Sequence, residues 1–431
     1  AGMGRYSFFG SRPFATLSFQ QGRVWIQEEG RSHTSSASPL CVLKDMLARY
    51  KIKDSPGLWP FLCGAVGFLS YDFGFSLEHF QKRHKTLDRV PELCFSFYDS
   101  VVAKDHHTDE VLIFSSGWPR SGVGRSRRAK ERLDEMRQRL SRPAPAAGRQ
   151  TEEFIDPRLV VPNFSRREYL EALRRVKAHI AAGDIYQLNL SQKFSARSSL
   201  DSWSLYRRLV QKFPVAFSAF FQEKDFSILS VSPELFLNCR GGVVTTRPMK
   251  GTRPRTGVAR KDRLLKKELW SSAKEKAELL MVVDLERNDL GRVCDYRSIK
   301  VIHPRMIEAY RNVFQVTAQV QGRLHRAKDR VDLLHACFPG GSVTGCPKIR
   351  AMEIIEELEP HDRGIYTGSL GYLSFHDTMA FNILIRSIFR EKDRLSFCVG
   401  GGIVADSVPS AEYEETLVKA RALMQALTGR P

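Results

Sequence analysis

One lysine in the sequence stands in a setting that could make it a chemical reagent. Lys250 lies in the stretch TTRPMKGTRPR, residues 245–255, between Pro248 and Gly251. Proline fixes the backbone and glycine frees it, so this pattern predicts a shaped loop rather than a helix. A lysine held in such a loop can act as a nucleophile if its pKa is lowered. The alternative is one more solvated cation in a basic run.

Two predicted helices each carry a pair of glutamates three residues apart, so that both members of a pair lie on one face. The four residues are Glu275, Glu278, Glu412 and Glu415. The first of these helices, 271–292, is expected to bury Leu280, Met281 and Val283. Either pair alone is also what a solvated helix surface contains. Brought together, the pairs offer the oxygen ligands that magnesium prefers, and a cation relieves the repulsion between them.

Two glycine-rich turns could bind an anion. The first, FPGGSVTGC at 338–346, precedes a predicted helix, and the second lies in CVGGGIVADS at 398–407. Such turns present backbone N–H groups to an anion. The first has the spacing of a phosphate-binding loop, but Cys346 and Pro347 replace the required Lys and Ser or Thr, so nucleotide binding is excluded there.

An arginine accompanies the glycine-rich turns. Arg386 lies in NILIRSIF, a predicted strand over 382–389 that falls between the two turns in the sequence. A guanidinium group can bind a carboxylate with two parallel hydrogen bonds, which a lysine cannot do. The sequence therefore favours a carboxylate ligand for this region.

The elements that must position these residues follow from hydrophobic periodicity. Ser165 and Glu168 form a capping box before a helix, and Gly183 is a natural end for that helix. From Tyr186 the period becomes two, which places Gln187 on the polar face of a strand. A strand with one polar face can line a polar cavity, and a half-solvated surface strand is the alternative.

The N-terminal third has a different pattern. Residues 6–116 predict short strands and turns, because β-branched and aromatic residues are enriched there. A basic helix near 126–141 and a segment rich in Pro, Ala and Gly follow, and they place a domain boundary near residue 150. We therefore expect an N-terminal accessory domain, 1–150, and a catalytic domain, 151–431.

Composition narrows the class of protein. The 431 residues are 42% hydrophobic and carry a net charge of +19. No apolar run approaches the roughly 18–20 residues of a membrane span, and no signal peptide is evident. Eight cysteines without a C-x-x-C pair predict free thiols in a cytoplasmic protein. Basic chains often bind nucleic acid, but here the cations are spread along the chain, so we expect neither a nucleic-acid nor a membrane partner.

Several segments together resemble the chorismate-utilising enzymes. They are GDIYQLNLS, SPELFL, RPMKGTRPR, MVVDLERNDLGR, FPGGSVTGCPKIRAMEIIEELEP, RGIYTGSLGY and GGGIVADSVPSAEYEETLVKA, in the family's order across 165–425. The resemblance implies an α+β fold, an α/β sandwich of large antiparallel sheets flanked by helices, as in anthranilate synthase component I. CGAVGFLSYDFGFSLE, 63–78, resembles the accessory domain of these enzymes.

The residue at one position differs between members of this family that catalyse different reactions. Anthranilate synthases typically carry alanine where this chain has Lys250, whereas aminodeoxychorismate synthases carry the lysine. Gln187 stands where water-activating members have a lysine base. The resemblance therefore implies that chorismate is aminated to 4-amino-4-deoxychorismate, the precursor of 4-aminobenzoate and folate. Anthranilate synthesis, another conversion of chorismate, and a catalytically degenerate relative are the alternatives.

The resemblance also implies roles for individual residues. Lys250 is expected to be the nucleophile, with its pKa lowered by burial or by cations such as Arg247 or Arg253, and Glu234 the general acid. Mg²⁺ is expected at the four paired glutamates named above. The residues expected to bind substrate are Arg386, Tyr366, Lys419, Thr344, Gln187, Gly400, Gly401 and Gly402. Because no amidotransferase motif is visible, ammonia is expected from a separate glutamine amidotransferase subunit.

Two positions depart from the family pattern close to the expected substrate. Gln315 replaces a usual histidine, and Ala380 replaces a usual aspartate. They leave open a reduced activity or a shifted reaction.

Overall fold

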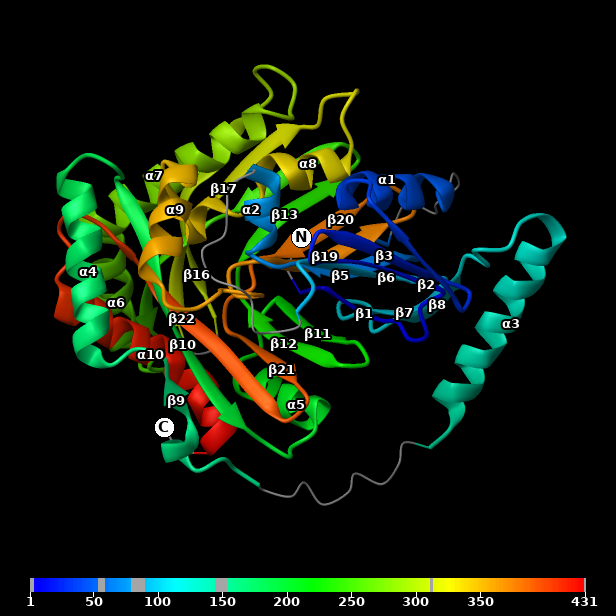
Figure 1. Ribbon diagram of the computed structural model, residues 1–431, viewed down its shortest axis with the longest axis horizontal. Helices are drawn as coiled ribbons and strands as arrows, with labels where there is room; N and C mark the ends of the chain where they lie inside the picture. Colours follow the sequence, from blue (N-terminus) through cyan, green and yellow to red (C-terminus); the bar gives the residue numbers. More distant parts are fainter. Residues whose placement is uncertain (1–3, 53–58, 79–89, 144–152, 311–312, 430–431) are drawn as a thin grey trace.

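The computed structural model describes residues 4–52, 59–78, 90–143, 153–310 and 313–429. Within these residues the strands form three antiparallel sheets, and Figure 1 shows the two large ones meeting in the middle of the molecule. The largest sheet has the order β15 (Met249–Pro254), β17 (Val313–Arg323), β14 (Val243–Arg247), β13 (Leu235–Arg240), β20 (Met379–Asn382), β19 (Ser369–Ser374), β5 (Gly64–Leu69), β6 (Leu93–Tyr98), β2 (Ala15–Gln20), β3 (Arg23–Glu28) and β4 (Arg31–Ser35), with β16 (Lys300–Ala309) beside β17.

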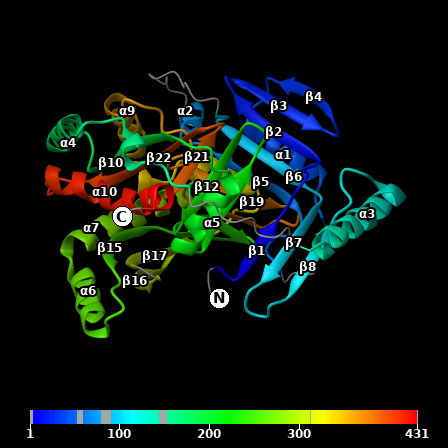
Figure 2. The same cartoon turned by 90° about the horizontal axis from the view of Figure 1, so that it is seen from below.

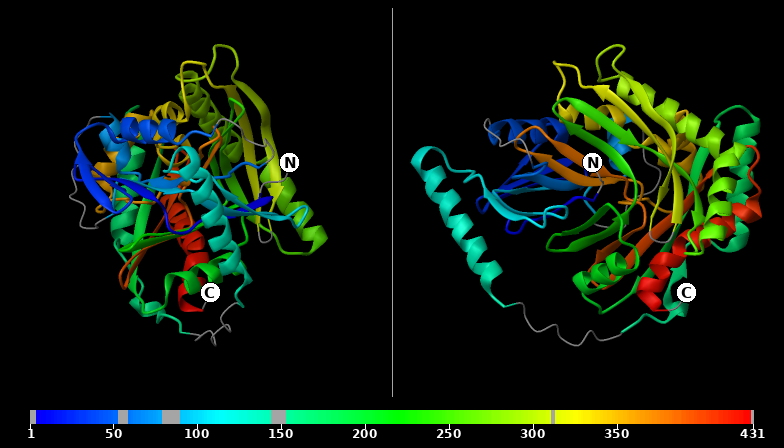
Figure 3. Two further views of the ribbon diagram at one scale, coloured as in Figure 1. Left: turned by 90° about the vertical axis from the view of Figure 1, so that its right-hand side faces the viewer. Right: turned by 180° about the vertical axis from the view of Figure 1, so that it is seen from behind.

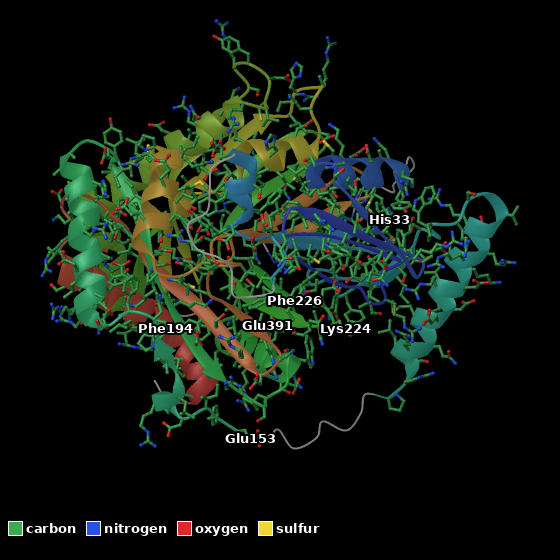
Figure 4. All side chains as sticks on the ribbon, in the orientation of Figure 1. His33, Glu153, Phe194, Lys224, Phe226 and Glu391 are labelled. Carbon is green, nitrogen blue, oxygen red and sulfur yellow. The ribbon has the colours of Figure 1, made fainter. Side chains whose placement is uncertain are left out.

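The second sheet carries the long central strands of the C-terminal part. Its order is β11 (Phe217–Gln222), β12 (Phe226–Ser232), β21 (Ser387–Glu391), β22 (Arg394–Ile403), β10 (Gln187–Arg197) and β18 (Gly345–Cys346), with β9 (Val161–Pro162) beside β10. Phe226 of β12 pairs with Glu391 of β21 (Figure 4). Phe194 of β10 stacks on Phe397 of β22. A third, small sheet contains β1 (Tyr6–Phe9), β7 (Ser100–Asp105) and β8 (Val111–Ser115).

Helices cover the outer faces of the sheets. They are α1 (Pro39–Arg49), α2 (Phe73–Glu78), α3 (Gly122–Ser141), α4 (Arg166–Ala181), α5 (Ser202–Lys212), α6 (Ala259–Ser271), α7 (Ala273–Gly291), α8 (Arg330–Cys337), α9 (Lys348–Leu358) and α10 (Pro409–Thr428). α10 lies along β22 between α4 and α5, whereas α3 stands at the far edge against β7 and β8 (Figure 3). In the described residues no helix has both the length and the apolar composition needed to cross a membrane.

The N-terminal strands continue the sheet of the C-terminal part. β5 pairs with β19 over six residue pairs, and Figure 2 shows β2 to β6 side by side with them. Phe97 packs on Phe375 and Phe95 on Phe381, so both parts of the chain contribute to one core. The boundary expected at residue 150 lies outside the described residues. The residues on either side of it are nevertheless joined by main-chain hydrogen bonds and shared apolar burial.

Several sequence-based predictions are confirmed. Large antiparallel sheets flanked by helices give the predicted α+β class. α4 begins with the capping box of Ser165 and Glu168, and Gly183, with φ of +83°, follows its end. All eight cysteines are free. The prediction for α7 is confirmed only for Val283, which is buried: Leu280 is 60% exposed and Met281 only partly buried, whereas Leu279 and Val282 are buried.

Candidate active site

Lys250 lies in a strand, not in the loop predicted for 245–255. β14 ends at Arg247 and β15 begins at Met249, so Pro248 only separates two strands that both pair with β17. The pairing register shifts between Lys250 and Thr252, and Gly251 takes a φ of +70° at that shift. A bulge of this kind turns a side chain away from the regular pleat, and it is common next to active sites.

The amine of Lys250 lies at the junction of several elements. Its Nζ donates a hydrogen bond to the backbone oxygen of Ser342 at 3.3 Å. The same Nζ lies 3.3 Å from the position that a Cβ atom on Gly402 would take, and the Gln187 amide nitrogen lies 2.8 Å from that position. Any side chain at Gly402 would therefore displace one of these two groups. β10, β15, β22 and the first glycine-rich turn meet here.

Burial lowers the pKa of Lys250, and the carboxylates of Glu278 and Glu234 oppose this by favouring the charged amine. Lys419 is the cation that adds to the lowering. The expectation that Arg247 or Arg253 would do so is not met, because Arg247 pairs with Glu308 and Arg253 with acids of α6 and α7.

Glu234 lies in the turn between β12 and β13, where the chain passes from the second sheet to the largest one. The residue is 4% exposed, and burial raises its pKa to about 7. A hydrogen bond from the Ser342 side chain and the charge of Lys250 oppose this rise. A carboxyl group with such a pKa is protonated in a large fraction of molecules near neutral pH, so it can act as an acid.

Arg386 lies where the chain passes back from the largest sheet to the second sheet, between β20 and β21. The strand predicted over 382–389 is interrupted here, and Arg386 takes a φ of +50°. Its backbone oxygen accepts from Val231, and burial lowers the pKa of its guanidinium while Glu234 opposes the shift. The two neighbouring crossings thus place an acid and an arginine within electrostatic range of each other.

The polar face of β10 is buried rather than half-solvated. Gln187 is 2% and Asn189 7% exposed, whereas the preceding Tyr186 is 71% exposed. The Gln187 Oε1 and Asn189 Oδ1 atoms have no hydrogen-bond partner among the described residues. Buried acceptors are normally paired, so these two atoms are available to a ligand.

The first glycine-rich turn packs against this face. Thr344 is fully buried, its hydroxyl donates to the Gly340 carbonyl oxygen at 3.0 Å, and its own carbonyl accepts from Asn189 at 2.8 Å. Gly345 leaves no room for a side chain, because a Cβ would lie 2.3 Å from the Gln187 carbonyl oxygen.

Tyr366 is buried, and its ring lies 5.8 Å from the guanidinium of Arg363.

Arg363 is a buried arginine that contacts several segments of the site, and the sequence analysis did not single it out. It pairs with Glu359 at 2.7 Å and donates to the carbonyl oxygens of Val343 and Asn189. It therefore ties the glycine-rich turn to β10 and to the segment of Tyr366. Ser342 was missed as well, although it contacts both Lys250 and Glu234. The sequence signals that could have pointed to these two residues are their positions: Arg363 lies in RGIYTG, and Ser342 lies in the first glycine-rich turn.

The four paired glutamates come from two helices that approach the same strands. The Glu275 Oε2 atom lies 2.6 Å from the position that a Cβ atom on Gly251 would take. The Glu412 Oε2 atom lies 3.5 Å from the position that a Cβ atom on Gly401 would take. Each glutamate is paired with a cation of the chain. The pairs are Arg253–Glu275, Lys274–Glu278, Lys274–Glu412 and Lys419–Glu415. As placed, no three His, Cys, Asp or Glu residues in the described part of the chain lie close enough to form a metal site.

Lys419 reaches the second glycine-rich turn from α10. Its Nζ donates to the Gly400 carbonyl oxygen at 2.9 Å, and it lies 3.9 Å from where a Cβ of Gly401 would be. The glycines at 400–402 belong to β22, so this turn is the end of a strand. Of the residues expected to bind substrate, Gln187, Gly402 and Lys419 therefore lie around Lys250. Thr344 contacts β10, Arg386 lies within electrostatic range of Glu234, and Tyr366 lies beside Arg363.

The two departures from the family pattern differ in position. Gln315 pairs with Thr252 in β17, next to the strand of Lys250, and its Oε1 atom is buried without a partner in the described residues. Ala380 instead lies opposite Tyr372, whose ring packs on Phe8 and Phe61. Directly opposed residues point to the same face of a sheet, so Ala380 faces the N-terminal aromatic residues.

Comparison with known proteins relates this arrangement to one family. The model of the chorismate binding enzymes matches residues 4–425. The aminodeoxychorismate synthase component 1 of Bacillus subtilis strain 168 is 36% identical over 427 residues, which cover 98% of this chain and 89% of the relative. The anthranilate synthase component 1 of Pseudomonas aeruginosa PAO1 is 37% identical over 98% of this chain and 87% of the relative.

A solved structure agrees with the sequence relatives. The crystal structure of anthranilate synthase component I from Streptococcus pneumoniae TIGR4 superposes with a TM-score of 0.84 at 30% identity. The match covers 97% of this chain and 92% of that one. The two proteins therefore share one fold over nearly the whole length of this chain.

Proposed function

The chain belongs to the chorismate binding enzymes, and from this we propose that it aminates chorismate to 4-amino-4-deoxychorismate. The observation that carries the proposal is the position of Lys250, a partly buried amine with a lowered pKa beside Gly402, Gln187 and Glu234. A solvated lysine would have neither this burial nor these neighbours. Several relatives are named aminodeoxychorismate synthase component 1, in agreement with this reaction.

The first step uses Lys250 and Glu234 together. The neutral amine of Lys250 attacks carbon 2 of chorismate, the double bonds shift, and the bond from carbon 4 to its hydroxyl breaks. Hydroxide is a poor leaving group, so Glu234 transfers its proton and water departs. Burial supports both roles, because it favours the neutral form of each residue.

The second step reverses the shift. Ammonia attacks carbon 4, the double bonds return, and the bond between carbon 2 and Lys250 breaks to release the neutral amine. The Glu234 carboxylate takes the excess proton from the new ammonium group, which restores both residues. We infer that a separate glutamine amidotransferase subunit supplies the ammonia, and the relatives' designation as component 1 supports a partner component.

Magnesium belongs to the same proposal. Carboxylate oxygens are the ligands that this hard cation prefers, and Glu278 and Glu412 already share one positive charge, that of Lys274. These two residues, with Glu275 and Glu415 beside them, would hold the ion. When bound, it supplies positive charge for a carboxylate of the substrate. Arg386 and Tyr366 would bind the enolpyruvyl carboxylate.

The test is the product formed from chorismate, Mg²⁺ and an ammonium salt, identified by chromatography and mass spectrometry. We expect 4-amino-4-deoxychorismate from the wild type and a loss of at least about a thousandfold in Lys250→Ala, because the nucleophile is gone. Lys276→Ala is the matched control, since Lys276 is an exposed lysine of α7.

A second measurement addresses the intermediate directly. With chorismate but no ammonia, intact-protein mass spectrometry should detect an adduct of chorismate minus water on the wild type and none on Lys250→Ala. Anthranilate as the product would favour the reaction of the Pseudomonas relative and would contradict the role of Lys250.

A further inference from the structure

Lys274 occupies the centre of the glutamate group. It lies in the first turn of α7, and its Nζ is 3.2 Å from Glu412 Oε1 and 3.8 Å from Glu278 Oε1. These acids come from two helices that are far apart in the sequence, α7 and α10. Lys274 therefore bridges the two carboxylates across the interface between the helices.

The other two glutamates have cations of their own. Glu275 pairs with Arg253 at 3.6 Å, and Glu415 pairs with Lys419 at 2.8 Å. Glu278 and Glu412 are the members of the group that share one cation, Lys274, and Lys250 adds a second positive charge that acts on Glu278. Their side chains are 11% and 5% exposed, so without a cation their mutual repulsion would be poorly screened.

Only one oxygen of Glu412 is engaged by Lys274. Oε1 accepts both from Lys274 and from the Ser407 hydroxyl, the latter at 2.6 Å, whereas Oε2 faces the backbone of Gly401. Ser407 holds this carboxylate in place independently of Lys274. A departure of the ammonium group would thus leave the carboxylate oriented towards the glycine strand.

The side chain of Lys274 has a route out of the site. It is 46% exposed, although both of its partners are nearly buried. Rotation about its side-chain bonds can carry the ammonium group to solvent without moving α7, because a lysine has a long and flexible stem.

From this geometry, and resting on the proposed function, we propose that Lys274 is a built-in competitor of magnesium. Its ammonium group neutralises Glu278 and Glu412 in the metal-free protein, and it must swing into solvent before Mg²⁺ binds between them. The residue is a positioning residue that sets the affinity for the metal: it keeps the two carboxylates together and raises the Mg²⁺ concentration needed to fill the site.

Isothermal titration of the purified full-length chain with MgCl₂, without chorismate, tests the proposal. Lys274→Gln keeps most of the side chain and removes the charge, so it should bind Mg²⁺ about tenfold more tightly than the wild type. Lys276→Gln, on the same helix and exposed, makes the same charge change and should bind as the wild type does. An equal gain in both variants would indicate a general charge effect and overturn the proposal.

Thermal unfolding gives an independent readout. Without metal, Lys274→Gln should melt below the wild type, because Glu278 and Glu412 lose their shared counter-charge, and saturating Mg²⁺ should raise its melting temperature more than that of the wild type. Weaker or unchanged Mg²⁺ binding in Lys274→Gln would refute the competition, as would the absence of Mg²⁺ binding in all three proteins. Neither result depends on turnover, so the amination of chorismate is judged separately by its product.

Discussion

Burial shifts the pKa values of Lys250 and Glu234 in opposite directions, and both shifts suit the proposed reaction because both favour the neutral form. It lowers the pKa of the lysine and raises that of the glutamate to about 7. Each residue also opposes the other's shift, because an ammonium and a carboxylate stabilise each other's charge. The fraction of the protein with Lys250 neutral and Glu234 protonated therefore decides how much of it is competent at a given pH.

The pH dependence of kcat/KM follows from this pair. Activity should rise with pH as Lys250 loses its proton, and it should fall again at alkaline pH as Glu234 loses its own. The measurement is kcat/KM between about pH 5 and 10, with the concentration of free ammonia held constant at every pH. A profile that keeps rising without an alkaline limb would contradict the assignment of Glu234 as the acid.

At the scale of elements, the helix α7 contributes residues both to the candidate active site and to the core. Its N-terminal half carries Glu275 and Glu278, and its C-terminal half buries Glu286 and Asp289. Glu286 accepts a hydrogen bond from Thr246 at 3.2 Å, and burial raises its pKa to about 8. The helix therefore contains an acid that is held neutral near physiological pH.

The stability of the protein should depend on Glu286 with a definite sign. The folded-state pKa of about 8 lies above the unfolded value, so the stability that Glu286 contributes is fully present below about pH 4 and is lost as pH rises through 8. Glu286→Gln cannot ionise, so its free energy of unfolding should exceed that of the wild type by about 4 kcal/mol at pH 8, and by no such amount near pH 4.

Urea unfolding of Glu286→Gln at the two pH values measures this difference. Asp284→Asn, an exposed substitution on the same helix, should be nearly neutral at both. A gain for Glu286→Gln that is the same at acid and alkaline pH would show that packing, not ionisation, is responsible.

At the scale of the whole molecule, the largest sheet joins residues on both sides of position 150. β5 and β6 of the N-terminal part complete the layer that begins with β15, the strand of Lys250. Removing them would expose the apolar face of β19 and β20, including Phe381 and Leu373, which are at most 1% exposed. Large exposed apolar surfaces lead to aggregation rather than to a stable fold.

The fragment 151–431 should therefore not fold alone. We expect it to be insoluble or to unfold without a cooperative transition, whereas co-expression with 1–150 should restore a soluble, active complex. The full chain cut at a protease site inserted after residue 150 is the control, and it should stay folded. A fragment 151–431 that melts cooperatively and retains activity would show that the two parts are independent domains.

The sequence by itself determined the elements whose signals are local. The capping box of α4, the strand β10 and the strands of the N-terminal third depend on neighbouring residues, and they are found where the sequence predicts them. The family motifs pointed to Lys250 and Glu234 as expected site residues.

Only the tertiary structure decided where these residues meet and what surrounds them. The bulge at Gly251, the sheet crossing at Arg386 and the shared counter-charge on Glu278 and Glu412 depend on segments more than sixty residues away. The burial that lowers the pKa of Lys250 has the same origin. Local sequence carries no record of such contacts, because burial and electrostatic fields arise from distant segments packed together.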